Sequence, residues 1–572
     1  MKPSSTKVGL TVILIAGVCA VVLITYWPSL DAKAFSFDDQ QYLTRNILVQ
    51  NPGLGSAKRF LTEVLTPSTV AGYYQPLAMI SLMVDYAAGG RENNLRPFHI
   101  TSLAFHTANT VLVILLLYML FGNIWAAAGA GLLFGVHPMT VEPIPWVGER
   151  KTLLAAFFAL WSLILYVRYS RSGGWKAYAG CFAMYLLALM SKPTSVPLPA
   201  VMVLMDYWPL KRLSVKSLWE KLPLFVLGGL FAVITYISQH RTGGTVAPTQ
   251  YGPWHILLVL CHNIVLYLYK IFYKMILPVN LSSHYAFPKP FDFSQPMVLA
   301  GVIGTCILIP LLLVSLRWTR AALTGWLIFF VAIFPTMGVV GFTVVIAADR
   351  FVYLPAVGLL MVLTAFLIWF GRSKRIRIAV IGVVLVLASA EAVATGRYLY
   401  YWQDTFTLYD YMLRFAPHSA PLYNGRGVAY NRKGEYDLAI ADYDRAIEID
   451  PEFAGAYSNR GNVYDSQGKY DLAISDYNRA IELNPRYAAV YNNRGTAYHH
   501  KGEYGLAISD YKKTIEINST LVGVYFNMAS AFESLARKKE AIEAYKAFIK
   551  YAPSQHASYI ERARQRIKEL ER

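Results

Sequence analysis

Apolar segments long enough to cross a bilayer follow one another through roughly the first 395 residues of the chain. The first covers residues 8–26 and the last covers residues 377–395. A transmembrane helix needs about 20 apolar residues, so the pattern predicts an all-α, polytopic membrane domain with about 11 spans. The other apolar segments are 98–121, 124–142, 152–168, 176–191, 195–210, 222–238, 254–277, 297–316, 321–341 and 351–371.

Segment 254–277 differs from the others because polar residues recur along one side of it. His262, Lys270 and Lys274 are separated by four residues or a multiple of four, which places them on one helical stripe. We therefore expect an interfacial or re-entrant helix here, although a complete crossing stays open. With this assignment the strongly basic loops fall on the inner side, as the positive-inside rule prefers.

The N-terminus is predicted to be cytoplasmic because Lys2 and Lys7 precede the first span. This orientation makes residues 31–97 a long external loop. Within the loop, an apolar run that contains Asp85 fits a helix lying along the membrane interface better than a crossing.

After residue 416 the pattern changes to a 34-residue period. The recurring residues are prolines (Pro417, Pro451, Pro485 and Pro553, with Ser519 at the missing position), glycines (Gly427, Gly461 and Gly495), alanines (Ala439, Ala473, Ala507 and Ala541) and tyrosines (Tyr443, Tyr477, Tyr511 and Tyr545). Small residues at helix crossings with aromatic residues between them are typical of the tetratricopeptide repeat (TPR), a helix pair that stacks into an α-solenoid.

The sequence therefore divides into a membrane domain over residues 1–396, a connecting amphipathic helix over 397–416, and a TPR domain over 417–572. The TPR domain is predicted to hold four repeats, the last of which has Ala529 in place of glycine. A charged helix over 554–572 would cap the solenoid.

Composition agrees with a membrane protein that carries an attached domain. Hydrophobic residues make up 55% of the 572 residues and charged residues only 15%, which excludes a single soluble globule. Most of the net charge of +18 lies in the first 420 residues, where basic loops set orientation, so a nucleic-acid partner is not expected. The four cysteines lie in apolar segments and form neither a disulfide framework nor a metal-binding spacing.

Ionisable residues collect at the ends of spans that are predicted to be external. Asp38 and Asp39 follow the first span, and the others are His137, Glu142, Glu149, Arg150, Lys151, Lys192, Asp349 and Arg350. Charges near hydrocarbon are costly, so a group of them at one membrane face indicates a functional site. Taken singly, each has a plain alternative: a solvated turn for the acid pair, and snorkelling to lipid headgroups for a cation.

Several motifs, in this order along the chain, resemble a known family. They are Phe37-Asp38-Asp39-Gln40-Gln41-Tyr42, Tyr74-Gln75-Pro76-Leu77, Val136-His137-Pro138-Met139, Glu149-Arg150-Lys151, Ser191-Lys192-Pro193, Asp206-Tyr207-Trp208-Pro209-Leu210 and Ala348-Asp349-Arg350-Phe351. Together they resemble bacterial membrane proteins that join a GT-C-type glycosyltransferase module to TPR repeats. The chain is also similar in layout to the eukaryotic transmembrane and TPR-containing O-mannosyltransferases.

The resemblance implies a sugar transferase that uses a polyprenyl-phosphate-linked monosaccharide, with acidic residues of the first external loop at the catalytic centre. A carboxylate there can accept the proton of an acceptor hydroxyl. Asp38 or Asp39 can be this base, and the position of the family's first acidic residue favours Asp38. Asp39 would then orient Asp38, or the pair would hold a divalent cation (Mg²⁺ or Mn²⁺). No other cofactor is predicted.

The predicted ligands of the donor phosphate are Arg150, Lys151, Lys192 and Arg350, because guanidinium and ammonium groups both bind phosphate oxygens. Arg350 can instead be neutralised by Asp349.

Four further residues are assigned supporting roles: His137, Glu142, Glu149 and Asp349. Glu142 can be a second carboxylate of the site or the partner of Arg150, and His137 can simply belong to a turn that ends a helix.

In the TPR domain, Asn459, Asn493 and Asn527 recur in one register, next to Arg426, Arg460 and Arg494. This ladder of amide and guanidinium groups is predicted to hold the backbone of an acceptor protein or peptide. The alternatives are hydrogen bonding between repeats and simple solvation.

We expect an enzyme of a bacterial cytoplasmic membrane, with the active site and the TPR domain on the periplasmic face, in contact with lipid. Two alternatives stay open: a non-enzymatic TPR scaffold for envelope or secretion assembly, and a ligase for lipid-linked oligosaccharides. A scaffold needs only one span to hold it in the membrane, whereas about 11 are predicted here, so the scaffold is the weaker hypothesis.

Overall fold

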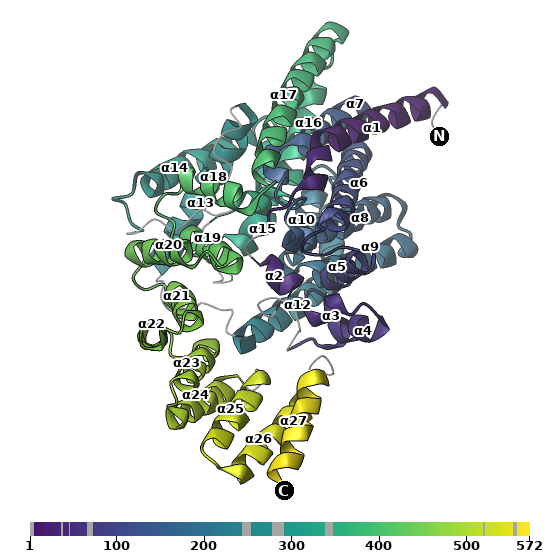
Figure 1. The fold of residues 1–572 in the computed structure, drawn as a ribbon. Coiled ribbons are helices and arrows are strands. Elements are labelled where there is room, and N and C mark those ends of the chain that lie inside the picture. Colours follow the sequence, from purple (N-terminus) through teal and green to yellow (C-terminus); the bar gives the residue numbers. More distant parts are fainter. Residues whose placement is uncertain are drawn as a thin grey trace. The chain divides into compact units, whose positions relative to one another are not determined.

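The computed structural model describes residues 5–35, 38–44, 46–65, 73–242, 253–276, 291–337, 347–518, 521–552 and 557–572 (Figure 1). All elements in these ranges are helical, which confirms the all-α prediction. Contacts divide the chain into a first unit, Met1–Phe415, and a second unit, Ala416–Arg572.

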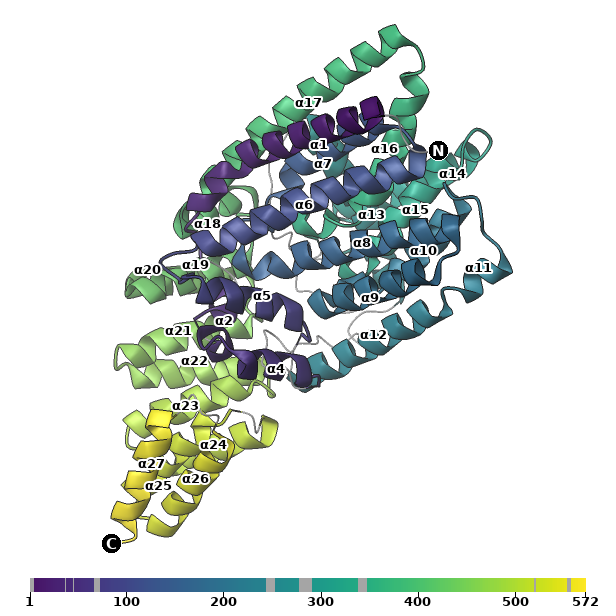
Figure 2. The same cartoon turned by 90° about the vertical axis from the view of Figure 1, so that its right-hand side faces the viewer.

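The helices of the first unit follow the predicted apolar segments closely. They are α1 (Ser5–Tyr26), α6 (Arg96–Phe121), α7 (Ile124–Val136), α8 (Arg150–Ser172), α9 (Trp175–Ser191), α10 (Leu198–Tyr207), α11 (Val215–Trp219), α12 (Leu222–Thr242), α13 (Pro253–Ile276), α14 (Pro296–Ser315), α15 (Ala321–Ile333), α16 (Ala356–Phe370) and α17 (Lys374–Tyr401). In Figure 2, α1, α6 and α7 lie side by side, with α17 along α1.

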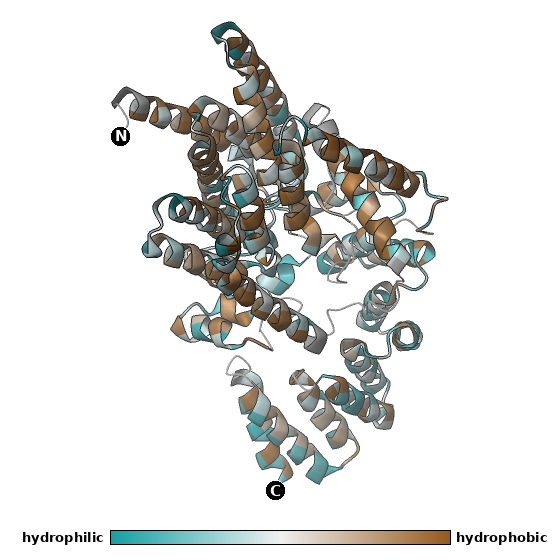
Figure 3. Cartoon of the chain, turned by 180° about the vertical axis from the view of Figure 1, so that it is seen from behind, coloured by the Kyte–Doolittle hydropathy of each residue, from teal (hydrophilic) through white to brown (hydrophobic). Residues whose placement is uncertain are grey.

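Six helical segments in the described ranges are long and apolar enough to cross a membrane, and shorter apolar helices accompany them. In Figure 3 the helices of the first unit are predominantly hydrophobic along their length. These features are consistent with a multi-pass membrane protein. The count of about 11 spans stays a prediction, because several of the helices, including α7 and α15, are short.

Helix α13 occupies the segment predicted to be interfacial. His262 is buried on it and contacts the Asn263 side chain, which in turn donates to the carbonyl of Met337. The side chain of Lys274 lies outside the described residues.

The predicted external loop is folded rather than extended. It contains α2 (Asp39–Tyr42), α3 (Ile47–Gln50), α4 (Leu54–Thr62) and α5 (Pro76–Ala87). Buried apolar side chains from this loop form one core with Phe98 of α6 and Val147; among them are Tyr42, Val49 and Met79. The loop is therefore a small packed layer, and this packing fixes the position of α2.

The start of the loop is also fastened to the end of α17. Ala34 N donates to the carbonyl of Trp402, and Phe35 N donates to the hydroxyl of Thr405. The connecting helix is shorter than predicted: α18 covers Thr405–Phe415, because residues 397–401 continue α17.

The second unit consists of helix pairs with the predicted period. The pairs are α19 (Ala420–Lys433) with α20 (Tyr436–Ile449), α21 (Ala454–Ser466) with α22 (Tyr470–Leu483), α23 (Ala488–His500) with α24 (Tyr504–Ile517), and α25 (Gly523–Ser534) with α26 (Lys538–Tyr551). The periodic glycines permit close contact within each pair: a Cβ at Gly461 would lie 2.8 Å from the ring of Tyr477. Ser519 and Pro553 lie outside the described residues.

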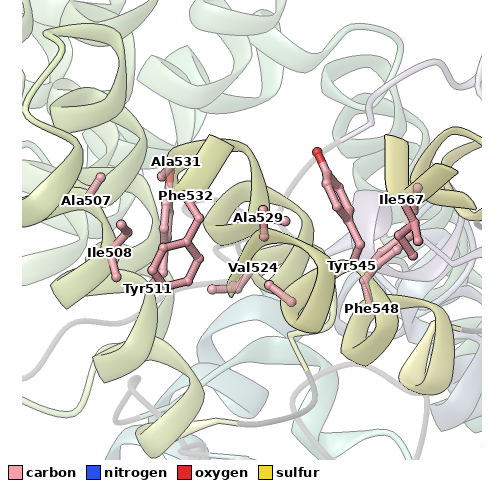
Figure 4. Packing of buried hydrophobic residues seen from close by; sticks show 13 residues of the cluster. Ala507, Ile508, Tyr511, Val524, Ala529, Ala531, Phe532, Tyr545, Phe548 and Ile567 are labelled. Carbon is pink, nitrogen blue, oxygen red and sulfur yellow. The ribbon is translucent and has the colours of Figure 1, made fainter. Parts of the chain in front are cut away.

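The fourth repeat packs like the others despite its alanine. Ala529, Phe532 and Tyr545 belong to one buried cluster (Figure 4), and Ile567 of α27 (Ala557–Leu570) joins it. The last helix therefore closes the apolar core of the solenoid.

Candidate active site

Asp38 is the most exposed acid of the predicted site, with 27% of its side chain accessible. It immediately precedes α2. Trp146 Nε1 donates to its Oδ1 at 3.1 Å, and Lys151 Nζ donates to its Oδ2 at 3.3 Å. The carboxylate is thus fixed in place by two donors that reach it from a distant part of the chain.

Asp39 lies in a different environment. It is fully buried, and its Oδ1 accepts a hydrogen bond of 2.8 Å from the backbone N–H of Gly148. A Cβ at Gly148 would lie 2.7 Å from Asp38 Oδ1 and 3.0 Å from the ring of Tyr42, so the acid pair packs against a position that has no room for a side chain. The two acids therefore lie in distinct environments, one accessible and one buried.

Three of the predicted cations meet around Glu149. Its Oε1 lies 3.6 Å from Lys151 Nζ and 3.1 Å from Arg350 Nε. Its Oε2 lies 3.2 Å from Lys192 Nζ and also accepts from Thr152. Since Lys151 contacts Asp38 as well, the acid at the rim and all three cations belong to one network, here called the charged cluster.

Lys192 lies in this cluster just after α9. Besides Glu149 it contacts Thr152 Oγ1 at 2.7 Å. Burial lowers the pKa of Lys192 to about 8; Glu149 opposes the shift, and Lys151 and Arg350 reinforce it. The amine is therefore charged at neutral pH but close to losing its proton.

Glu142 joins the cluster through Arg350. The Arg350 Nη1 lies 3.4 Å from Glu142 Oε2, and the hydroxyl of Tyr398 donates to Glu142 Oε1 at 3.3 Å. Glu142 pairs with Arg350 rather than with Arg150, and Asp349 is buried next to Arg350.

Arg150 is not brought into the charged cluster. Its guanidinium is fully buried, where Nη1 lies 2.7 Å from Asp85 Oδ2 of α5. It also donates to the Ser81 hydroxyl and to the carbonyl of Phe98. Arg150 thereby joins α5, which carries Asp85 and Ser81, to Phe98 of α6.

His137 directly follows α7, and its Nδ1 accepts a hydrogen bond of 3.1 Å from Met139 N. Its Nε2 is 3.9 Å from Oε1 of Glu391, a fully buried carboxyl of α17. The His-Pro turn follows the end of α7, so His137 belongs to a turn that ends a helix, which was the alternative to a supporting role in the site.

The acid pair does not present itself as a metal chelate in this arrangement. Asp38 is engaged by Trp146 and Lys151, whereas Asp39 is directed to Gly148. Across the described ranges, no group of three or more His, Cys, Asp or Glu side chains is arranged to hold a metal ion.

In the second unit, the predicted arginines form pairs inside each repeat. Arg460 binds Asp476 through two hydrogen bonds of 2.8 and 2.6 Å. Arg426 with Asp442, and Arg494 with Asp510, repeat the same geometry.

The asparagines bond between repeats: Asn459 to Asn424, Asn493 to Asn462 and Asn527 to Asn492. Hydrogen bonding between repeats was one of the alternatives for these asparagines, and these contacts agree with it. Binding of a peptide by the asparagines and arginines stays a prediction.

Three residues of the site were not singled out from the sequence. Trp146 holds Asp38 and lies under the Arg350 guanidinium, 4.6 Å from ring centre to Cζ. Tyr42 accepts from Lys151 at 2.9 Å, and Gly148 makes room for both acids. Trp146 and Gly148 lie directly before the Glu149-Arg150-Lys151 motif, and Tyr42 ends the motif that contains the acid pair, so their places in the sequence were the available signal.

Comparison with known proteins agrees with both units. TPR family models match residues 427–468, 461–502, 488–521 and 522–555. The chain contains TPR repeats and is homologous to protein O-mannosyl-transferases of the TMTC type, at 23–27% identity.

Two relatives illustrate the extent of the similarity. Human protein O-mannosyl-transferase TMTC2 is 27% identical over 209 residues, which cover 35% of this chain and 24% of the relative. Protein O-mannosyl-transferase F38B6.6 of Caenorhabditis elegans is 23% identical over 415 residues, or 70% of this chain and 57% of the relative. The chain thus matches about a quarter of the length of TMTC2.

Solved structures resemble the chain over a limited part. The crystal structure of MamA is 27% identical and covers 27% of this chain and 84% of its own, with a TM-score of 0.25. The structure of YrrB, a TPR protein, is 19% identical and covers 28% of this chain and 88% of its own, also with a TM-score of 0.25.

Proposed function

We propose that this protein is a membrane glycosyltransferase that moves a monosaccharide from a polyprenyl-phosphate donor to a hydroxyl group of an acceptor protein. The observation that carries the proposal is the connection of an accessible carboxylate, Asp38, to the cations Lys151, Lys192 and Arg350 within one network. Such a site combines a base with a place for an anionic leaving group. Homology to enzymes named O-mannosyl-transferases supports the same class.

In the proposed reaction, Asp38 accepts the proton of the acceptor hydroxyl as its oxygen bonds to the anomeric carbon of the sugar. The bond between that carbon and the phosphate oxygen breaks, and its electron pair leaves with the polyprenyl phosphate. The transition state has oxocarbenium character: positive charge develops on the sugar ring and negative charge develops on the departing phosphate. Lys192 and Arg350 stabilise this negative charge, while Trp146 and Lys151 keep Asp38 oriented.

An apolar cleft supports a lipid-linked donor. It is lined mainly by aliphatic side chains of α8, α10, α15 and α16, including Leu163, Val201 and Ala332. Thr194 and Leu354 also line it, two residues after Lys192 and four after Arg350. The cleft is small and would hold only a short part of an isoprenoid chain, beside residues that are close in sequence to Lys192 and Arg350.

We further propose that the TPR unit recruits the acceptor protein, and that the enzyme works in a bacterial inner membrane with its active site facing the periplasm. Helical repeats suit an extended peptide because they offer the same groups at regular intervals. A scaffold without catalysis would have no need of an accessible acid joined to a cation cluster.

The test is sugar transfer by purified protein with a panel of polyprenyl-phosphate sugars and candidate acceptor peptides. We expect Asp38→Asn to lower the rate by a factor of about 10²–10⁴, the usual contribution of a general base, without changing thermal unfolding. Asp39→Asn should instead lower the unfolding temperature, because Asp39 is buried and bonded to Gly148. Equal turnover by Asp38→Asn and wild type would rule out the mechanism.

A further inference from the structure

Three cations of the charged cluster contact the same residue, Glu149. Lys151 and Arg350 contact one of its carboxylate oxygens, and Lys192 contacts the other. The three cations come from α8, from the turn after α9, and from the turn before α16. One carboxylate therefore holds together a cation site whose parts lie far apart in the sequence.

Side-chain exposure orders these charges from the interior outward. Glu149 has 4% of its side chain accessible, whereas Arg350 has 9%, Lys151 13% and Lys192 14%. Asp38, with 27% of its side chain accessible, lies at the rim beside Lys151, and the three cations lie between it and the more deeply buried carboxylate of Glu149 in order of exposure. Glu149 therefore neutralises the cations without blocking access to them.

The hydrogen-bonding capacity of the cations permits sharing. Lys192 uses two of its three donors on Glu149 and Thr152, and the Arg350 guanidinium has five donors, so these two cations can contact Glu149 and a phosphate oxygen at the same time. The three donors of Lys151 are directed to Glu149, Asp38 and Tyr42. A phosphate bound in this way would be attracted by the cations and repelled by the carboxylate. The affinity of the site for phosphate then depends on the charge of Glu149.

We propose that Glu149 is a positioning residue that holds the three cations together and limits how tightly they bind phosphate, so that the polyprenyl phosphate left after transfer can leave. The inference rests on the proposed function, since it concerns the same site. Glu149 touches neither the sugar nor the acceptor; it acts through Lys151, Lys192 and Arg350.

Replacement of Glu149 by glutamine tests the proposal, because it removes the charge while keeping a carbonyl acceptor of similar size. An opposite charge at this distance shifts a pKa by one unit or more, which corresponds to about a 10-fold change in affinity. We expect Glu149→Gln to bind undecaprenyl phosphate about 10-fold more tightly than wild type. Both KM for the donor and kcat should fall, because the product leaves more slowly.

A merely structural role predicts the opposite pattern, with unchanged or weaker binding of undecaprenyl phosphate and a lower kcat. Unchanged or weaker binding of undecaprenyl phosphate by Glu149→Gln would overturn the proposal. Glu149→Asp keeps the charge and should bind undecaprenyl phosphate as wild type does. Thr152→Val removes a hydroxyl that contacts Glu149 and Lys192 without changing the charge, so it should not tighten binding.

If Glu149→Gln does not fold, the double variant Glu149→Gln/Lys192→Gln removes one charge of each sign and provides the same test. It should bind undecaprenyl phosphate more tightly than Lys192→Gln alone, and equal binding by the two would overturn the proposal.

Direct binding separates this inference from the proposed function. If wild type binds undecaprenyl phosphate but transfers no sugar from any donor, the proposed function fails and the binding constants still decide the role of Glu149. If wild type does not bind undecaprenyl phosphate, both proposals fail.

Discussion

The ammonium group of Lys151 lies 3.3 Å from the carboxylate of Asp38, although 113 residues separate the two in the sequence. Lys151 lies in the first turn of α8, whereas Asp38 precedes α2 of the folded external loop. Their contact joins the proposed base to the proposed phosphate site, so the position of the loop bears directly on catalysis.

Gly148 offers a test of how closely the acid pair is held. A methyl group at this position would lie 2.7 Å from Asp38 Oδ1, a separation that requires the carboxylate to move. We expect Gly148→Ala to reduce sugar transfer by about 10²-fold, since a shift of about 1 Å at a catalytic group can cost that much. Gly55→Ala in α4 of the same loop is the control, because its Cβ would meet no atom within 4 Å. Similar rates for both variants would contradict the prediction.

The pKa of Lys192 predicts an alkaline limit to activity. Burial lowers this pKa to about 8, so the amine carries its charge below pH 8 and loses it above. We expect kcat/KM for the donor to fall as the pH rises through about 8, because a neutral amine no longer attracts phosphate. Lys192→Arg should move the fall to higher pH, since a guanidinium stays charged. Lys176→Arg, at the exposed start of α9, should leave the pH profile unchanged, and identical profiles for all three proteins would exclude this role of Lys192.

Much of the fold follows from local pattern. Apolar runs predicted helices such as α6 and α8 within a few residues, because a membrane helix depends on its own composition. The 34-residue period predicted the TPR pairs for the same reason, since each repeat contacts only its neighbours.

Ion-pair partners were much less predictable. Arg150 and Lys151 are adjacent and chemically alike, yet packing directs Arg150 to Asp85 and Lys151 to Asp38. Which acid meets which base is decided by the folded loop, through contacts between distant segments. The sequence contains the charges but does not specify their partners.

The Arg150–Asp85 pair leads to a prediction about stability. Removing one partner of a buried ion pair leaves the other unpaired, which costs about 3–5 kcal/mol. We therefore expect Arg150→Met to lower the unfolding temperature of the membrane unit strongly. The double variant Arg150→Met/Asp85→Asn should recover part of the loss, because no buried charge remains. Equal unfolding temperatures for the single and double variants would show that the pair is not the cause.

In the TPR unit, the paired arginines are expected to stabilise the repeats. Arg460 binds Asp476 through two charge-assisted hydrogen bonds and is about one-fifth exposed. Arg460→Ala should cost about 1.5–3 kcal/mol, measured as faster hydrogen exchange in α21 and α22. Arg445→Ala breaks an exposed pair with Glu448 and should change exchange very little. Similar exchange in both variants would argue against a stabilising role.

The apolar cleft permits a test of the lipid donor that leaves the charged cluster intact. Ala332 lines the cleft together with Val201 and Leu354, and an indole at this position would fill it. Each buried methylene contributes about 0.8 kcal/mol, so displacing about two methylene-sized groups of the chain from this small cleft should raise KM for a long-chain donor by about 10-fold. A donor with a short prenyl chain should be used as well as before, because it does not reach into the cleft. Val386→Trp, at an exposed position of α17, provides the control for added bulk. If Ala332→Trp leaves KM for the long-chain donor unchanged, the polyprenyl chain binds elsewhere, and the catalytic roles of Asp38 and the cations would have to be tested without reference to this cleft.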